Sequence, residues 1–374
     1  MNDVIIIGGG LAGLINAVLL NKAGFSVLLI ERKNYPFHRV CGEYISNEVI
    51  PFLSSLDIDL NKLGVARINR LEVTAASGIK IAKKLDLGGF GLSRYTFDHY
   101  LFKKASADGV RFLLDTRVED VNYSNGIFDV SVPGKVLQAP LVIGAFGKRS
   151  NLDQKLKRDF FYKRSPYLAV KFHIRADFPD DLIQLNNYKN GYCGVSKIET
   201  DRYCMCYMAR RDDLRKCGTL VELEKNIICR NPYLKKLFDT AEFLLDKPEV
   251  INEISFEKKQ LVENHLLMSG DTAGMIAPLC GNGMTMAIHS AKILSENIIR
   301  YYTPGQFDNE KRSILEKAYR DEWEGHFAKR LWTGRQIQRM FGHNTATSVS
   351  LKLLKALPSL ADYLISKTHG QPFS

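Results

Sequence analysis

Val4-Ile5-Ile6-Ile7-Gly8-Gly9-Gly10-Leu11-Ala12-Gly13 stands almost at the start of this chain, and it predicts the fold. The unbroken apolar run 4–7 is typical of a strand buried on both faces in a parallel sheet. Gly8 permits a tight turn, Gly10 lets the backbone approach a pyrophosphate, and Gly13 allows the following helix to pack closely. The stretch predicts a Rossmann-like α/β fold that binds a dinucleotide at a helix N-terminus. The cofactor contacts expected here are Gly8, Gly10, Leu11, Ala12 and Gly13.

An acidic residue ends the second apolar strand, expected over residues 26–30. Glu31 lies about twenty residues after Gly10, where a carboxylate accepts hydrogen bonds from a ribose 2′-hydroxyl. The same carboxylate would repel a 2′-phosphate, so this position favours FAD or NAD over NADP. Arg32, beside it, is a further expected cofactor contact.

A second glycine signature lies far along the chain, before a helix expected over residues 285–301. Asp271, at a strand end, can bind a ribityl hydroxyl, and backbone N–H groups of the glycine-rich stretch can reach a flavin ring. A helix N-terminus there stabilises negative charge on the reduced ring. With the first signature this predicts one FAD site; alone, the stretch could be a glycine-rich helix cap. The expected contacts are Gly270, Asp271, Pro278, Gly281, Asn282, Gly283 and Met284.

Length and composition set broad limits. The chain has 374 residues, enough for two or three domains, and its 45% hydrophobic and 25% charged residues are ordinary for a globular protein. We expect neither a membrane span nor a signal peptide, because long apolar runs and a basic N-terminal region are lacking. The odd count of seven cysteines favours reduced thiols and a cytoplasmic location. Cys204-x-Cys206 has no second pair, so no metal site is expected.

The net charge of +11 is compatible with an anionic cofactor or substrate, a membrane surface or nucleic acid. Because the basic residues are spread along the chain, nucleic acid is not expected. Residues 350–366 combine leucines with lysines, so this tail either packs on the body or makes a peripheral membrane contact. The oligomeric state is left open.

The order of expected elements indicates a discontinuous architecture. Parallel-sheet strands at both ends of the chain enclose a stretch of alternating, antiparallel strands. We therefore expect an FAD-binding domain in residues 1–70, 90–158 and 256–303, a substrate-binding domain in residues 71–89 and 159–255, and a helical C-terminal region in residues 304–374.

Taken together, these motifs resemble the FAD-dependent aromatic hydroxylase and geranylgeranyl reductase superfamily, which also contains flavin halogenases and squalene-type epoxidases. The resemblance covers roughly residues 1–300. It implies that Arg94 lies by the FAD phosphates or ribityl chain, whereas a surface helix cap is the alternative for this arginine. The matching positions are Gly8, Gly10, Gly13, Glu31, Arg94, Asp98, Gly144, Ala145, Gly147, Ser150, Gly270, Asp271, Pro278, Gly281 and Gly283.

The chain departs from the family pattern at two places. Phe146 replaces an aspartate that the family links to both FAD and the nicotinamide, which puts direct binding of NADH or NADPH in doubt. Either of these, or a partner protein, could be the electron donor. Gly194 and Ser196 stand where reductases have a bulky tryptophan and a proline, so the cavity would be differently shaped.

Cys41-Gly42 resembles a pair that reductases of this group carry beside the flavin ring. Cys41 and Gly42 are therefore expected cofactor contacts, and Cys41 is the candidate catalytic residue. A thiol there could donate a proton or tune the flavin. A buried structural cysteine is the alternative.

The expected substrate is a hydrophobic small molecule. In the strand expected over residues 202–209, Tyr203, Met205 and Tyr207 share one face, with Tyr192 opposite, and such a face suits an apolar ligand. Ordinary sheet core is the alternative. No partner for His173 or His289 follows from spacing, so both are interpreted as structural.

These observations favour an FAD-dependent oxidoreductase, and narrowly a monooxygenase that hydroxylates its substrate. The alternative is a reductase that saturates carbon–carbon double bonds, which Cys41-Gly42 supports. A third hypothesis, of another class, is a prenyl-binding protein of the same fold that does not use flavin.

Overall fold

The fold is built on a mostly parallel sheet, as the opening stretch predicts. The computed structural model describes residues 2–276, 281–340, 344–357, 359 and 370–374. Six described strands pair in the order β17-β18-β10-β1-β2-β6, and only β17 runs antiparallel to its neighbour. Their bounds are β1 Val4–Ile7, β2 Val27–Ile30, β6 Arg111–Leu113, β10 Leu141–Gly144, β17 Val262–Glu263 and β18 Leu266–Met268. β1 is buried over its whole length, as expected of a central parallel strand.

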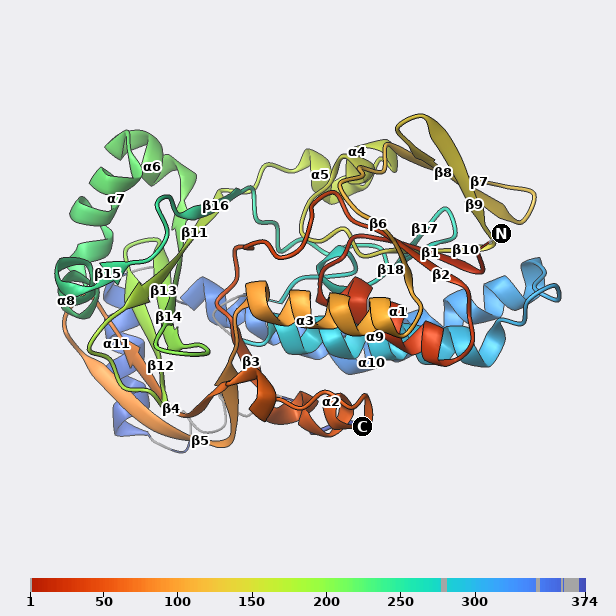
Figure 1. Cartoon of the computed structure of the whole chain (residues 1–374). Coiled ribbons are helices and arrows are strands. Elements are labelled where there is room, and N and C mark those ends of the chain that lie inside the picture. Colours follow the sequence, from red (N-terminus) through yellow and green to blue (C-terminus); the bar gives the residue numbers. More distant parts are fainter. Residues whose placement is uncertain (1, 277–280, 341–343, 358, 360–369) are drawn as a thin grey trace.

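Four long helices cover one face of this sheet. α1 contacts α3 and α9, and α9 contacts α10, so the four run side by side in Figure 1. They are α1 Leu11–Lys22, α3 Arg94–Ala107, α9 Gly283–Tyr301 and α10 Asn309–Met340. Together with the sheet they enclose the largest apolar core.

A small antiparallel sheet lies beside the six-stranded one, at the upper right of Figure 1. It consists of β7 Asp120–Ser124, β8 Ile127–Val132 and β9 Lys135–Ala139. Asn125 and Gly126 join β7 to β8 in a hairpin, with positive φ at both residues. The first strand of this hairpin begins at Asp120.

The second large sheet is mostly antiparallel. Its order is β15-β11-β14-β13-β12-β4-β5-β3, and β16 also pairs with β11. The bounds are β3 Tyr44–Ser46, β4 Ala66–Thr74, β5 Lys80–Gly91, β11 Tyr167–Arg175, β12 Leu182–Tyr188, β13 Gly191–Lys197, β14 Tyr203–Arg210, β15 Glu242–Phe243 and β16 Glu249–Asn252. β12 and β3 were not foreseen. β12 runs parallel to β4, a pairing that local pattern does not reveal.

Short helices cover the outer face of this sheet, at the left of Figure 1. They are α6 Arg211–Cys217, α7 Leu220–Asn226 and α8 Pro232–Thr240. Leu223, Leu234 and Leu237 from these helices pack against Val170, Phe172 and Tyr207 of the sheet. A separate core therefore fills the space between sheet and helices.

The remaining described helices are α2 Ile50–Ser55, α4 Asn151–Lys155, α5 Asp159–Tyr162 and α11 Asn344–Ala356. Short 3₁₀ turns are η1 Asn47–Val49, η2 Asn61–Leu63, η3 Ile228–Arg230 and η4 Gly270–Thr272. None of the helices placed here is long and apolar enough to cross a membrane.

The α/β architecture with an inserted antiparallel sheet and C-terminal helices is confirmed. The expected domain limits stay a prediction. Within residues 1–70, which were assigned to the FAD-binding domain, β3 and the first residues of β4 belong to the larger, mostly antiparallel sheet. The helical tail is present in α10 and α11, whereas residues 360–368 lie outside the described part of the chain.

Candidate flavin site

The first glycine turn joins β1 to α1 and leaves no room for side chains. A Cβ on Gly13 would lie 1.9 Å from the Gly8 carbonyl oxygen, and one on Gly8 would lie 2.4 Å from the Ala145 oxygen. Gly8 also has φ +104°, a conformation that glycine adopts without strain. Backbone therefore packs directly on backbone, and the free N–H groups of α1 point out of the turn.

Glu31 lies at the end of β2, beside this turn. Its carboxylate accepts a hydrogen bond from the Gly9 N–H at 2.8 Å and pairs with Arg39 at 3.1 Å. Arg39 also pairs with Asp98 at 3.1 Å. The acid that was expected to meet a ribose is therefore held next to the glycine turn.

Arg94 begins helix α3 and points inward. Its guanidinium makes two 2.7 Å hydrogen bonds to Asp98, and its side chain is 14% exposed. A Cβ placed on Gly10 would lie 3.4 Å from Arg94 Nη2. Arg94 thus lies beside the glycine turn, not on the surface as a helix cap.

The second glycine signature meets the first in space. A Cβ on Gly270 would lie 2.7 Å from the Ala12 Cβ, and the Gly270 N–H donates to Ser290 Oγ at 3.2 Å. Asn282 donates to Glu48 at 2.8 Å at the start of α9. Pro278, also expected to contact the cofactor, lies outside the described residues.

A buried lysine forms hydrogen bonds to the backbone of this second turn. Lys259 Nζ donates to the carbonyl oxygens of Asp271 at 2.7 Å and Lys148 at 3.0 Å. Burial lowers the pKa of Lys259 to about 8. Since the spacing of a single lysine gives no signal, sequence reasoning missed this residue.

A cavity of about 390 Å³ lies where the two signatures and the larger sheet meet. Of the expected contacts it is lined by Gly10, Leu11, Ala12, Arg32, Cys41, Gly42, Arg94, Gly147, Asp271, Gly281, Gly283 and Met284. Three lining residues have a buried polar atom without a hydrogen-bond partner: His38 Nδ1, Tyr44 Oη and Arg149 Nη1. Glycine turns and unsatisfied polar atoms around one cavity, with Glu31 held beside the first turn, fit a dinucleotide that spans both turns.

A model of the FAD binding domain family matches residues 1–310. This chain belongs to that family. It is therefore an FAD-dependent oxidoreductase, and the hypothesis of a protein that does not use flavin is wrong.

Named relatives are distant. The chain is 25% identical over 378 residues to digeranylgeranylglycerophospholipid reductase 2 of Methanothermobacter thermautotrophicus, covering 96% of this chain and 89% of the relative. It is 23% identical over 350 residues to protein FixC of Escherichia coli K12, covering 83% and 79%.

Solved structures share the fold. The flavin-dependent brominase Bmp2 superposes with a TM-score of 0.80 at 20% identity, over 100% of this chain and 94% of that one. A geranylgeranyl bacteriochlorophyll reductase-like protein from Thermoplasma acidophilum gives 0.73 at 19% identity, over 92% and 89%.

A buried charge cluster stands behind the Cys41-Gly42 pair of this flavoenzyme. Glu43 is fully buried and has a φ of +56°. Its carboxylate forms hydrogen bonds with Lys171 Nζ at 2.9 Å and with His173 Nε2 at 2.6 Å. The Arg94 N–H donates to the same carboxylate at 3.0 Å. Glu43 thus links the cavity loop to strand β11 and helix α3.

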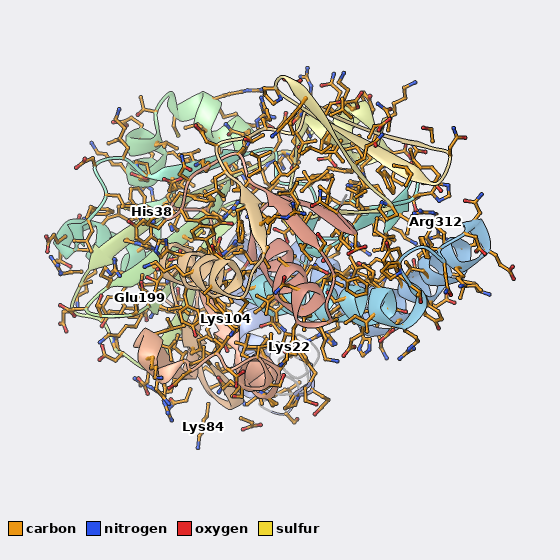
Figure 2. All side chains as sticks on the ribbon, turned by 45° about the vertical axis from the view of Figure 1, so that its right-hand side comes forward. Lys22, His38, Lys84, Lys104, Glu199 and Arg312 are labelled. Atoms are coloured by element: carbon orange, nitrogen blue, oxygen red, sulfur yellow. The ribbon has the colours of Figure 1, made fainter. Side chains whose placement is uncertain are left out.

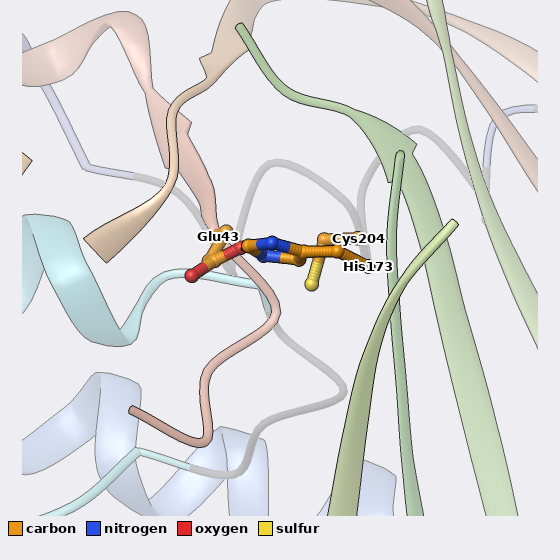
Figure 3. Close-up of side chains that lie close together, drawn as sticks. All are labelled: Glu43, His173 and Cys204. Atoms are coloured by element: carbon orange, nitrogen blue, oxygen red, sulfur yellow. The ribbon is translucent and has the colours of Figure 1, made fainter. Parts of the chain in front are cut away.

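Figure 3 shows Glu43, His173 and Cys204 converging from separate segments. Their potential ligand atoms lie within 4.8 Å of one another. The Lys171 ammonium group already supplies a positive charge to Glu43, so we interpret the group as an ion-pair cluster instead of a cation site. Cys204 Sγ donates to the Cys41 carbonyl oxygen at 3.2 Å and so holds the loop.

The cluster has a defined charge state. Burial alone would raise the pKa of Glu43, but Lys171 and the His173 hydrogen bond outweigh burial and lower it to about 2. Burial likewise opposes the Lys171 ammonium, yet Glu43 raises the pKa of Lys171 above its ordinary value. Burial, Lys171 and His173 lower the pKa of the nearby His38 to about 4, so its imidazole is neutral at pH 7.

The strand face expected to bind substrate is placed differently. Tyr203 and Met205 belong to the core under helices α6–α8. Tyr207 borders both sides, since its hydroxyl donates to Glu224 at 2.7 Å and it also lines the cavity. Cys206 and Met208, on the opposite face of β14, line the cavity together with Tyr192. Tyr203 and Met205 were assigned to the wrong side because an aromatic pattern on a strand does not say which of its two faces lines the cavity.

Lys171 and His173 were missed as site residues, although a signal exists. They alternate along β11 with Val170 and Phe172, which pack in the outer core. A lysine and a histidine on one face of an otherwise apolar strand indicate a buried polar partner. His173, interpreted as structural from spacing, therefore has Glu43 as its partner.

Proposed function

We propose that this flavoenzyme saturates a carbon–carbon double bond in an apolar small molecule. The observation that supports this is the placement of the Cys41 thiol in the cavity wall, between the two glycine signatures and the larger sheet. The two glycine turns would hold FAD here, and in its reduced form it would supply a hydride to one alkene carbon. The other carbon takes a proton from the Cys41 thiol, which regains a proton from solvent, so the double bond gains two hydrogens in all.

The surroundings hold Cys41 in position. The Glu43 N–H donates to Cys41 Sγ at 3.5 Å, and Cys204 Sγ holds the Cys41 carbonyl. The Glu43–Lys171 pair then fixes Glu43 itself. A proton donor held on both sides in this way keeps its distance to a bound substrate.

The cavity wall suits an apolar substrate. Ile183, Leu185, Val195 and Met208 of the larger sheet line it, and Tyr192 adds an aromatic ring. The relative that is named a digeranylgeranylglycerophospholipid reductase supports an isoprenoid chain as the substrate class.

A monooxygenase is the second candidate, and one observation favours it. The neutral imidazole of His38 lines the cavity with Nδ1 buried and unpartnered. It can accept a hydrogen bond from the hydroxyl of an aromatic substrate and so increase electron density on the ring to be hydroxylated. Figure 2 labels His38.

The two functions differ in their need for oxygen. We expect dithionite-reduced protein to saturate a polyprenyl alkene without oxygen, as measured by mass spectrometry of the product. Cys41→Ser should lower this turnover by about a hundredfold, because general acid catalysis contributes on that scale, while FAD binding is unchanged. Cys217→Ser, on the distant helix α6, is the matched control.

A hydroxylated product formed only with oxygen would contradict the reductase and establish the monooxygenase. Full turnover in Cys41→Ser would leave the reaction class standing but remove the thiol as proton donor.

Gly194 sets the width of the cavity. A Cβ there would first meet Leu185 Cδ2 at 3.6 Å, which is ordinary contact. Gly194→Ala should therefore be tolerated, whereas Gly194→Leu should raise KM for a long or branched alkene about tenfold and spare a short one. Equal KM changes for both substrates would mean that residue 194 does not face the bound chain.

A further inference from the structure

Helix α11 presents an apolar stripe to solvent. Val349 and Leu353 of α11, together with Leu357 directly after its end, recur at every fourth position and are 65%, 51% and 48% exposed. Lys352 and Lys355 are exposed on the flank of this stripe. Residues 344–357 contain no aspartate or glutamate, so the described side chains of α11 combine an exposed apolar stripe with positive charge only.

The opposite side of α11 lies against the cavity wall. Leu351 is fully buried and packs in one cluster with Val73 and Leu185. Leu185 also lines the flavin cavity. Helix α11, at the lower left of Figure 1, therefore has its buried side against the cavity wall and its exposed stripe on the opposite side.

We propose that α11 rests on the surface of an anionic lipid bilayer and places the cavity wall next to it. The inference needs no particular reaction, although it would give an apolar substrate a short route to the cavity. Leucines spaced one turn apart enter the acyl boundary, and the flanking lysines meet anionic headgroups. Strand β5, which α11 contacts, also carries the exposed Lys84, which projects from the edge of the molecule in Figure 2, but this lysine lines a different pocket and is not counted in the proposed surface.

A second copy of the chain fits this surface less well than lipid does. In a two-fold contact the same stripe meets itself, and the α11 lysines of both copies come together. No acidic residue of 344–357 is available to balance them. Anionic lipid complements both the apolar side chains and the charge.

Sedimentation with lipid vesicles tests the proposal on the full-length, FAD-loaded protein. Two exposed lysines, each of which strengthens binding about fivefold, predict about twenty-five times stronger binding to mixed phosphatidylglycerol–phosphatidylcholine vesicles than to phosphatidylcholine alone. Leu353→Asp should weaken binding about tenfold or more. Val221→Asp, which changes a 69% exposed valine of α7, is the matched control and should bind as the wild type does.

Retained flavin absorbance and an unchanged melting temperature would show that Leu353→Asp is folded. Binding that is absent in the wild type, or lost equally in Val221→Asp, would overturn the proposal. A dimer by light scattering that Leu353→Asp dissociates, without any vesicle binding, would also overturn it and make the stripe a subunit interface.

Discussion

Gly13→Ala is expected to remove most FAD binding. The new Cβ would lie 1.9 Å from the Gly8 oxygen, and neither atom can move without shifting the turn that faces the pyrophosphate. Overpacking of this kind costs about 1–3 kcal/mol. If about 3 kcal/mol must be overcome before the cofactor binds, FAD affinity falls about a hundredfold, as flavin fluorescence titration of the apoprotein would measure.

The control is a glycine with space around it. Gly325 lies in α10 with no atom within 4 Å of an added Cβ. Gly325→Ala should keep FAD affinity and raise stability by about 0.4–1 kcal/mol, because alanine favours a helix. Equal FAD affinity in the two variants would mean that the close approach at Gly13 does not shape the cofactor site.

Glu43→Gln is expected to destabilise the protein strongly. The substitution keeps the size of the side chain but leaves the Lys171 ammonium without a counter-charge in a fully buried position. Breaking a buried pair from one side costs about 3–5 kcal/mol, which urea unfolding would measure. The double variant Glu43→Gln with Lys171→Met should lose less than Glu43→Gln alone, because no uncompensated charge remains.

The same pair predicts a pH dependence of stability. The folded pKa of Glu43, about 2, lies below its ordinary value of 4.5. Its contribution is therefore present above pH 4.5 and is lost as pH falls toward 2. Glu43→Gln should lack this acid-dependent part of the unfolding free energy. An acid profile identical to that of the wild type would argue against an ionised Glu43.

The cofactor end of the site was accessible to sequence reasoning because its signals are local. Gly8, Gly10 and Gly13 follow a buried strand directly, and Glu31 ends the next one, so spacing along the chain fixes their positions in space. Phe146, which the family resemblance marked as a departure, lines the cavity.

The substrate end was not accessible in this way. Whether Tyr203 or Cys204 of β14 faces the flavin depends on which side of the sheet helices α6–α8 cover, and strand alternation is equal on both sides. Lys171 and Glu43 are far apart in the sequence, and only the packing of β11 against the 41–43 loop brings them to 2.9 Å.

The sequence by itself determined the α/β fold, FAD as the cofactor and the two glycine turns proposed to hold it, because each depends on backbone geometry set by neighbouring residues. The tertiary structure alone decided which strand face lines the cavity, and it alone formed the Glu43–Lys171–His173 cluster and set α11 against the cavity wall. These features arise from contacts between distant segments. Such contacts depend on the free energy of burying whole apolar surfaces, which the local sequence pattern does not specify.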